Sequence, residues 1–197
     1  MDETDLLISF RSQEPTAALE QLFDAYADRV YRLGLSLLGN EQQAEDVVQQ
    51  TFLNILANRD RFEARSSFGS WIFRIAYNAG QDILRRRPET ALPGEDESAG
   101  EEDSIPLPQN LVEWQWTPEE MLGDSEAQSM IEEAVQRLPV KLRSVFHLRD
   151  VEELSIEETA AILGITPSAV KVRLHRARLA LREMLSSYFF EWSTQRS

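Results

Sequence analysis

The chain contains 197 residues, of which 42% are hydrophobic and none is cysteine, and its formal net charge is −14. The lack of cysteine excludes a disulfide scaffold and a thiolate metal site. No apolar run reaches membrane-spanning length, and the N-terminal residues are acidic where a signal peptide is basic. We therefore expect a soluble cytoplasmic protein of one or two domains that does not insert into a membrane.

The negative charge is concentrated in the middle of the chain. Residues 1–87 carry 10 basic and 13 acidic side chains, and residues 137–197 carry 10 and 7. Residues 88–136 carry 14 acidic side chains and no basic one. Because the two flanking segments are close to neutral, the acidic whole-chain average does not exclude nucleic-acid binding by either of them.

The first 87 residues have apolar side chains at helical spacing, which predicts three helices and no strand. The helices are expected around 19–37, 44–56 and 71–83. The third places aromatic residues beside cationic ones, a pattern typical of single-stranded DNA binding, although Trp71 and Tyr77 are also suited to a helix core. The candidate residues for holding an unstacked base and its strand are Ser66, Ser67, Phe68, Trp71, Arg74, Asn78, Arg85 and Arg86.

Residues 88–117 are rich in proline, glycine, serine and acidic side chains and show no helical period. Such a segment buries too little apolar surface to offset its ordering entropy, which predicts a flexible acidic linker. The linker divides the chain into an N-terminal domain (1–87) and a C-terminal domain (118–197), whose first helix is expected after Thr117. Since both domains have helical patterns, the predicted fold class is all-α.

Residues 155–178 have the pattern of a helix-turn-helix with a basic second helix. Ser155 and Glu158 form a capping box that starts the first helix. Gly164 is suited to end that helix, and the hydroxyl of Thr166 to cap the next one. The outer face of the second helix is then free to enter a major groove of DNA, the alternative being an ordinary helical hairpin with a solvated basic face. The candidate contacts on that face are Ser168, Lys171, Val172, His175 and Arg176.

No catalytic constellation is apparent in the sequence. His147 and His175 lie on different predicted helices. The acidic pairs at 152–153 and 157–158 are expected at exposed turn and helix-start positions, where they favour the helix dipole. There is no phosphate-binding glycine loop, so we expect neither an enzyme nor a metal site nor a cofactor.

The chain contains three characteristic segments in order: AEDVVQQTFLNIL (44–56), SSFGSWIFRIAYNAGQDILRRR (66–87) and the stretch from 138 to 178. Together they resemble the bacterial extracytoplasmic-function sigma factors, the small promoter-recognition subunits of RNA polymerase. The resemblance covers residues 15–87 and 118–185. It implies an alternative sigma factor that binds core RNA polymerase and promoter DNA and directs promoter-specific transcription initiation.

The resemblance also implies three contact surfaces. The third-helix candidates would open and read the minus-ten element, and the helix-turn-helix would read the minus-thirty-five element as duplex. Gln50 stands where the family usually has an acid, which removes a possible charge pair with the polymerase. Gly80 and Gln81 replace a more usual apolar pair, and a glycine there is expected to loosen the helix by about 1 kcal/mol. The residues that would dock on a coiled coil of the largest polymerase subunit are Asp46, Gln49, Gln50 and Phe52.

Several roles stay open at this point. A two-domain helix-turn-helix regulator that is not a polymerase subunit would have the same C-terminal domain, and an adaptor would use both domains to bind proteins. An anti-sigma factor is an expected partner. The linker is either a mimic of nascent RNA in the polymerase exit channel or only a tether. The C-terminal aromatic residues either dock a partner or seal the last helix: Tyr188, Phe189, Phe190 and Trp192.

Overall fold

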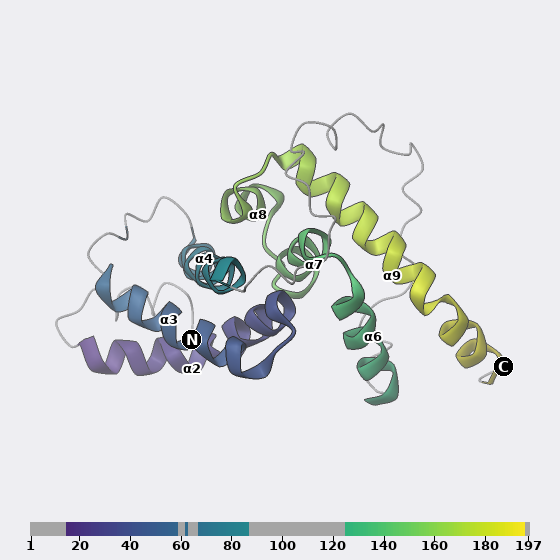
Figure 1. Cartoon of the computed structure of the whole chain (residues 1–197), viewed down its shortest axis with the longest axis horizontal. Coiled ribbons are helices and arrows are strands. Elements are labelled where there is room, and N and C mark those ends of the chain that lie inside the picture. The colour runs from purple at the N-terminus through teal and green to yellow at the C-terminus, as the bar shows by residue number, and fades with distance from the viewer. Residues whose placement is uncertain (1–14, 59–61, 63–66, 87–124, 196–197) are drawn as a thin grey trace.

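The computed structural model describes residues 15–58, 62, 67–86 and 125–195, and within these residues the chain is helical without strands, as predicted. Figure 1 shows α2, α3 and α4 stacked together at one end, the long α9 with α6 at the other, and α7 and α8 between them. The helices are α2 (Pro15–Leu38), α3 (Glu41–Ala57), α4 (Phe68–Arg86), α6 (Ser125–Arg137), α7 (Val140–Phe146), the π-helical turn η3 (His147–Val151), α8 (Ile156–Leu163) and α9 (Pro167–Gln195).

The first three helices pack closely because two glycines lie where they cross. A Cβ atom on Gly34 would lie 3.1 Å from the Cα of Ala44, so the glycine lets α2 approach α3. A Cβ atom on Gly80 would lie 2.8 Å from Leu37 Cδ1, so this glycine permits a close contact between α4 and α2 instead of only loosening its helix. The fully buried side chains around these crossings are Leu22, Val30, Leu33, Leu37, Val47, Ile55, Phe68, Ile72 and Phe73.

The start and stop signals predicted for the helix-turn-helix are confirmed. The Ser155 hydroxyl accepts from Glu158 N at 3.1 Å, and the Glu158 carboxylate accepts from Ser155 N at 2.9 Å, which completes the capping box. Gly164 adopts the left-handed conformation (φ 67°) at the end of α8. Thr166 Oγ1 accepts from Ala169 N at 3.1 Å at the start of α9. The core between these helices contains Val145, Ala160, Val170 and Leu174.

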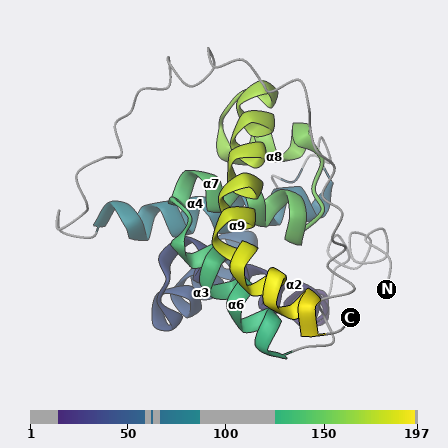
Figure 2. The same ribbon diagram turned by 90° about the vertical axis from the view of Figure 1, so that its right-hand side faces the viewer.

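The two helical halves lie against each other. Helix α8 packs on α4, and α7 packs on α2 (Figures 1 and 2). Three apolar residues of the second half, Leu148, Leu154 and Ile162, belong to the same buried cluster as the α2–α4 core. The halves therefore share a continuous apolar surface, a contact that composition and periodicity alone did not predict. A separate cluster joins α6 to α9: Ala134, Leu138, Ala177, Leu181 and Leu185.

Several predictions fall on residues that the structure does not describe. The linker (88–117), the helix start expected after Thr117 and the side chain of Ser66 all lie outside the described residues. Helix α9 continues into the C-terminal segment, but the side chains from 186 onward are also outside them. Among the described helices, none has the length and apolar character needed to cross a membrane.

Candidate nucleic-acid interface

The beginning of α4 is joined to the helix-turn-helix by polar side chains. The hydroxyls of Ser67 and Ser70 each lie 2.6 Å from Glu158 Oε1, to which they donate. The other carboxylate oxygen, Oε2, accepts from the backbone N and the hydroxyl of Ser155 at 2.9 and 2.8 Å. Burial raises the pKa of Glu158, but these hydrogen bonds outweigh it and lower the pKa to about 2. A single carboxylate therefore caps α8 and binds the first turn of α4.

The aromatic residues at the start of α4 form a packed cluster. Phe68 is fully buried, and its ring centroid lies 5.2 Å from that of Phe62 and 5.8 Å from that of Trp71. The expectation that Phe68 is free to hold a base is wrong, because its ring is part of the apolar core, where burial contributes about 1.5–3 kcal/mol. Trp71 is only half-buried, so its role as a base platform stays a prediction.

The later turns of α4 present the predicted cationic and polar residues to solvent. Tyr77 is half-buried and accepts a hydrogen bond from Gln81 Nε2 at 2.9 Å. Burial raises the pKa of Tyr77, against the smaller effects of Gln81 and Arg173. Arg85 pairs with Asp82 one turn earlier. The exposed side chains on this helix that were predicted to contact DNA are Arg74, Asn78, Arg85 and Arg86.

The outer face of α3 combines the predicted polar residues with exposed leucines. Leu53 and Leu56 are 52% and 42% exposed. Phe52 is 7% exposed and its ring lies 4.9 Å from that of Phe23, so the expectation that it docks directly on a partner is wrong: it supports the face from inside. The polar residues predicted for polymerase docking that are exposed on α3 are Asp46, Gln49 and Gln50.

The recognition helix α9 presents most of its predicted contacts outward. Ser168 and Lys171 are exposed, and His175 and Arg176 are half-buried. Val172 is only 8% exposed, so its expected place on the open face is wrong. It lies about 200° around the helix from Val170, which places it outside the core between α8 and α9. Although Val172 is not part of that core, its branched apolar side chain is still shielded from water.

A buried carboxylate forms the second polar contact between the halves. Glu152, whose side chain is 2% exposed, accepts from Arg29 Nε on α2 at 2.7 Å, and its other oxygen lies 3.5 Å from His147 Nε2. The Arg29 guanidinium lies over the rings of Tyr26 and Phe73 at 5.1 and 5.0 Å. Burial raises the pKa of Glu152, but His147 and Arg29 together hold it below its usual value.

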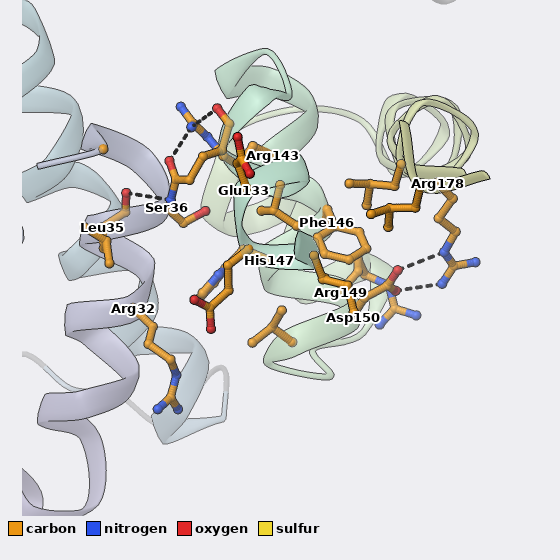
Figure 3. Close-up of a pocket in the computed structure, with 18 of the residues that line it drawn as sticks. Arg32, Leu35, Ser36, Glu133, Arg143, Phe146, His147, Arg149, Asp150 and Arg178 are labelled. Carbon is orange, nitrogen blue, oxygen red and sulfur yellow. Dashed lines mark hydrogen bonds and ion pairs between the residues drawn. The ribbon is translucent and has the colours of Figure 1, made fainter. Parts of the chain in front are cut away.

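A groove of about 1440 Å³ separates α2 from α6, α7, η3 and α9 (Figure 3). Gln136 bridges its edge: Gln136 Nε2 donates to the Leu35 carbonyl at 3.3 Å, and Arg143 Nη1 donates to Gln136 Oε1 at 2.7 Å. On the far side Arg178 donates to both oxygens of Asp150 at 2.9 and 2.6 Å. The groove lies beside the contact between the two helical halves, on the side where α6 is found.

Comparison with known proteins identifies two regions. The profile of Sigma-70 region 2 matches residues 22–89, and that of Sigma-70, region 4 matches residues 128–181. The chain is 35% identical over 169 residues to the ECF RNA polymerase sigma factor SigW of Bacillus subtilis, covering 85% of this chain and 89% of SigW. It belongs to the extracytoplasmic-function family of RNA polymerase sigma factors. The resemblance in the sequence is thereby confirmed.

The chain is also similar to two further proteins. The sigma factor CarQ of Myxococcus xanthus is 33% identical over 184 residues, covering 88% of this chain and 92% of CarQ. The structure of the sigma factor RpoE from Bartonella quintana, solved in complex with the anti-sigma factor NepR, has a TM-score of 0.62 with 24% identity, covering 85% of this chain and 96% of RpoE. The second likeness shows the fold.

The burial of two carboxylates at the contact between regions 2 and 4 was not predicted from the sequence. Glu152 and Glu158 were expected to be exposed, yet Glu152 is buried and Glu158 is half-buried. The capping box uses only Oε2 of Glu158, and nothing in the local sequence indicated that Oε1 would accept from Ser67 and Ser70 instead of from water. Nothing in the local sequence indicated that Glu152 would meet Arg29, which lies 123 residues away.

Proposed function

We propose that this chain is an alternative sigma factor that binds core RNA polymerase and directs promoter-specific transcription initiation. The observation that carries the proposal is the pairing, in one ECF sigma factor chain, of a helix-turn-helix with a cationic outer face and a helix α4 with exposed arginines. The proposed domains are 1–87 and 118–197, joined by the linker at 88–117.

Helix α3 is the proposed docking surface for the polymerase. Asp46, Gln49, Leu53 and Leu56 recur at three- and four-residue steps, so they lie in one stripe along the helix. Two exposed leucines in one stripe, bordered by polar side chains, match the apolar centre and polar rim of protein interfaces. The stripe is accessible in the structure, which supports its use as the first contact.

Two surfaces are proposed for promoter DNA. Helix α4 binds the single-stranded minus-ten element: Arg74, Asn78, Arg85 and Arg86 follow the strand, and Ser67 and Trp71 hold a base. Helix α9 enters the major groove at the minus-thirty-five element through Ser168, Lys171, His175 and Arg176. Phe68 is proposed to support the first surface from the core, since its ring is fully buried.

An anti-sigma factor is the proposed regulatory partner, supported by the fold shared with a sigma factor solved in such a complex. We expect the protein to act in the cytoplasm, where it meets the polymerase, and to have no enzymatic activity, cofactor or metal of its own. The two-domain regulator that is not a polymerase subunit is disfavoured by membership of the ECF sigma factor family across both regions.

Reconstitution with purified core polymerase tests the function. The wild-type chain should form a one-to-one complex and start transcription at a discrete promoter. Lys171→Ala should reduce that transcription by about tenfold or more, since a good base contact contributes about 1–3 kcal/mol, without changing affinity for core polymerase. Arg182→Ala, an exposed cation on the same helix, is the matched control. The absence of a stoichiometric complex would refute the proposal in favour of the independent regulator.

A further inference from the structure

We propose that Gln81 is a further specificity-determining residue of α4, which reads an adenine in the minus-ten element, and that Tyr77 positions its amide. The inference rests on the proposed function, because it assumes that α4 contacts promoter DNA. It adds to the proposed surface a residue that reads a base edge, and the identity of the base that this residue selects.

The first step concerns the place of Gln81 on the helix. Four residues of α4 that are proposed to contact DNA lie three, four and seven positions apart: Trp71, Arg74, Asn78 and Arg85. Gln81 divides the last interval into steps of three and four, so that all five positions lie within about 80° around the helix axis. Gln81 is half-buried, and its neighbours Asn78 and Arg85 are exposed. A DNA strand that follows this stripe therefore passes over the Gln81 side chain.

The second step is that the Gln81 amide is held in one orientation. Gln81 Nε2 donates to the Tyr77 hydroxyl oxygen at 2.9 Å, one turn earlier on the same helix. The Tyr77 ring packs against the buried cluster of α2–α4, which fixes the position of this acceptor. Burial raises the pKa of Tyr77, so the phenol stays neutral at physiological pH. A glutamine that is already held in place loses less conformational freedom on binding than a free one.

The third step concerns the base that such an amide selects. Beyond its hydrogen bond to Tyr77, the Gln81 amide has the acceptor Oε1 and a second N–H. An acceptor and a donor side by side match the N6 amino group and the N7 atom of adenine. On the same edge guanine presents only acceptors, thymine an acceptor and a methyl group, and cytosine only a donor. Adenine is therefore the base that satisfies both groups of the amide.

A purely structural role of the pair is the alternative, since polar side chains four residues apart also stabilise a helix. The two roles differ in what a substitution changes. Loss of a structural pair lowers stability and the overall amount of transcription, with the same ratio among the four bases. Loss of a base-reading pair changes the ratio between promoters that carry adenine and promoters that carry another base. A good bidentate contact corresponds to about five- to 150-fold discrimination.

The experiment uses the full chain with core polymerase and measures transcription from promoters in which each minus-ten position carries each of the four bases. At one position the wild type should prefer adenine by about fivefold or more. Gln81→Ala should lose that preference and retain the helix, because alanine is a strong helix former. Gln81→Glu should move the preference to cytosine, because a carboxylate accepts from the cytosine amino group but cannot donate to N7 of adenine.

The positioning role of Tyr77 has its own variant. Tyr77→Phe retains the ring and removes the acceptor, so it should reduce the adenine preference severalfold without moving it to another base. Tyr31→Phe is the matched control, because it removes the hydroxyl of another half-buried tyrosine, on α2. The base preferences of this control should equal those of the wild type.

An unchanged adenine preference in Gln81→Ala, or an equal loss of transcription with all four bases, would overturn the inference. If Gln81→Ala lost its cooperative thermal transition, Gln81→Glu would decide alone, because a structural defect does not change which base is preferred. Failure of the wild type to transcribe refutes the proposed function. Transcription without an adenine preference that depends on Gln81 refutes only this inference.

Discussion

The ion pair between Arg29 and Glu152 provides a test of how strongly regions 2 and 4 are joined. The perturbation is Arg29→Met, which retains an unbranched chain over Tyr26 and Phe73 but removes the cation. The buried carboxylate of Glu152 then loses its guanidinium partner and keeps His147 Nε2 at 3.5 Å. Arg29→Met should therefore destabilise the protein more than the loss of one surface ion pair would.

The magnitude follows from the burial of the two partners. Breaking a buried ion pair from one side costs about 3–5 kcal/mol. The Arg29 side chain is 35% exposed, so solvent screening reduces the expected loss in free energy of unfolding to about 2–3 kcal/mol. Glu152→Gln should cost only about 1 kcal/mol, because the freed arginine reaches water. The double variant Arg29→Met/Glu152→Gln should have the same free energy of unfolding as Glu152→Gln, because it contains no buried charge at this contact.

The contribution of Glu152 to stability should depend on pH with opposite signs in the wild type and in Arg29→Met. In the wild type the pKa of Glu152 lies below its ordinary value of 4.5, so its contribution is present above that pH and is lost as the pH falls further. Without Arg29, fewer interactions oppose the effect of burial on Glu152. Burial should therefore raise the pKa of Glu152 in the folded state above its pKa in the unfolded state. In Arg29→Met the contribution of Glu152 to stability is then present at low pH, and it is lost as the pH rises through the folded-state pKa of this carboxyl group.

Urea unfolding followed by circular dichroism at pH 5 and pH 8 measures the effect. The decrease in free energy of unfolding relative to the wild type should be larger at pH 8 than at pH 5 for Arg29→Met. For Glu152→Gln this decrease should be the same at both pH values. A deficit of Arg29→Met that is independent of pH, or a double variant as unstable as the sum of the two single ones, would refute the reasoning.

Two other predictions concern the core of region 2. Phe68→Ala should lower the free energy of unfolding by about 3–5 kcal/mol in a thermal or urea denaturation, because the ring is fully buried; a stable variant with a defect only in promoter melting would contradict this. Gly34→Ala should cost about 1–3 kcal/mol in the same measurement, since the added Cβ would lie 3.1 Å from Ala44 Cα and 3.2 Å from Val47 Cβ; an unchanged or raised stability would show that α2 and α3 are free to move apart.

The parts of the fold that depend on local chemistry were predictable from the sequence. The capping box at Ser155, the left-handed glycine at 164 and the hydroxyl cap at Thr166 each require only residues within four positions of one another. Such signals depend on backbone geometry, which neighbouring residues determine before any tertiary contact forms.

The exposure of individual side chains was predicted less well, because it depends on what packs against each helix. Phe68 and Trp71 belong to one pattern, yet only Phe68 is fully buried. Leu56 has the spacing of a core residue and is 42% exposed, since no described helix covers that side of α3. Glu152 appeared to be a surface carboxylate, and its burial follows from a partner 123 residues away.

The structure also suggests an order for the two proposed interactions. The leucine stripe of α3 is exposed while regions 2 and 4 are in contact, whereas Ser67 and Ser70 at the start of α4 already bind Glu158. The surface proposed for polymerase docking is therefore accessible in this arrangement, whereas a DNA strand that used the two hydroxyls at the beginning of α4, as proposed, would have to replace Glu158 as their acceptor.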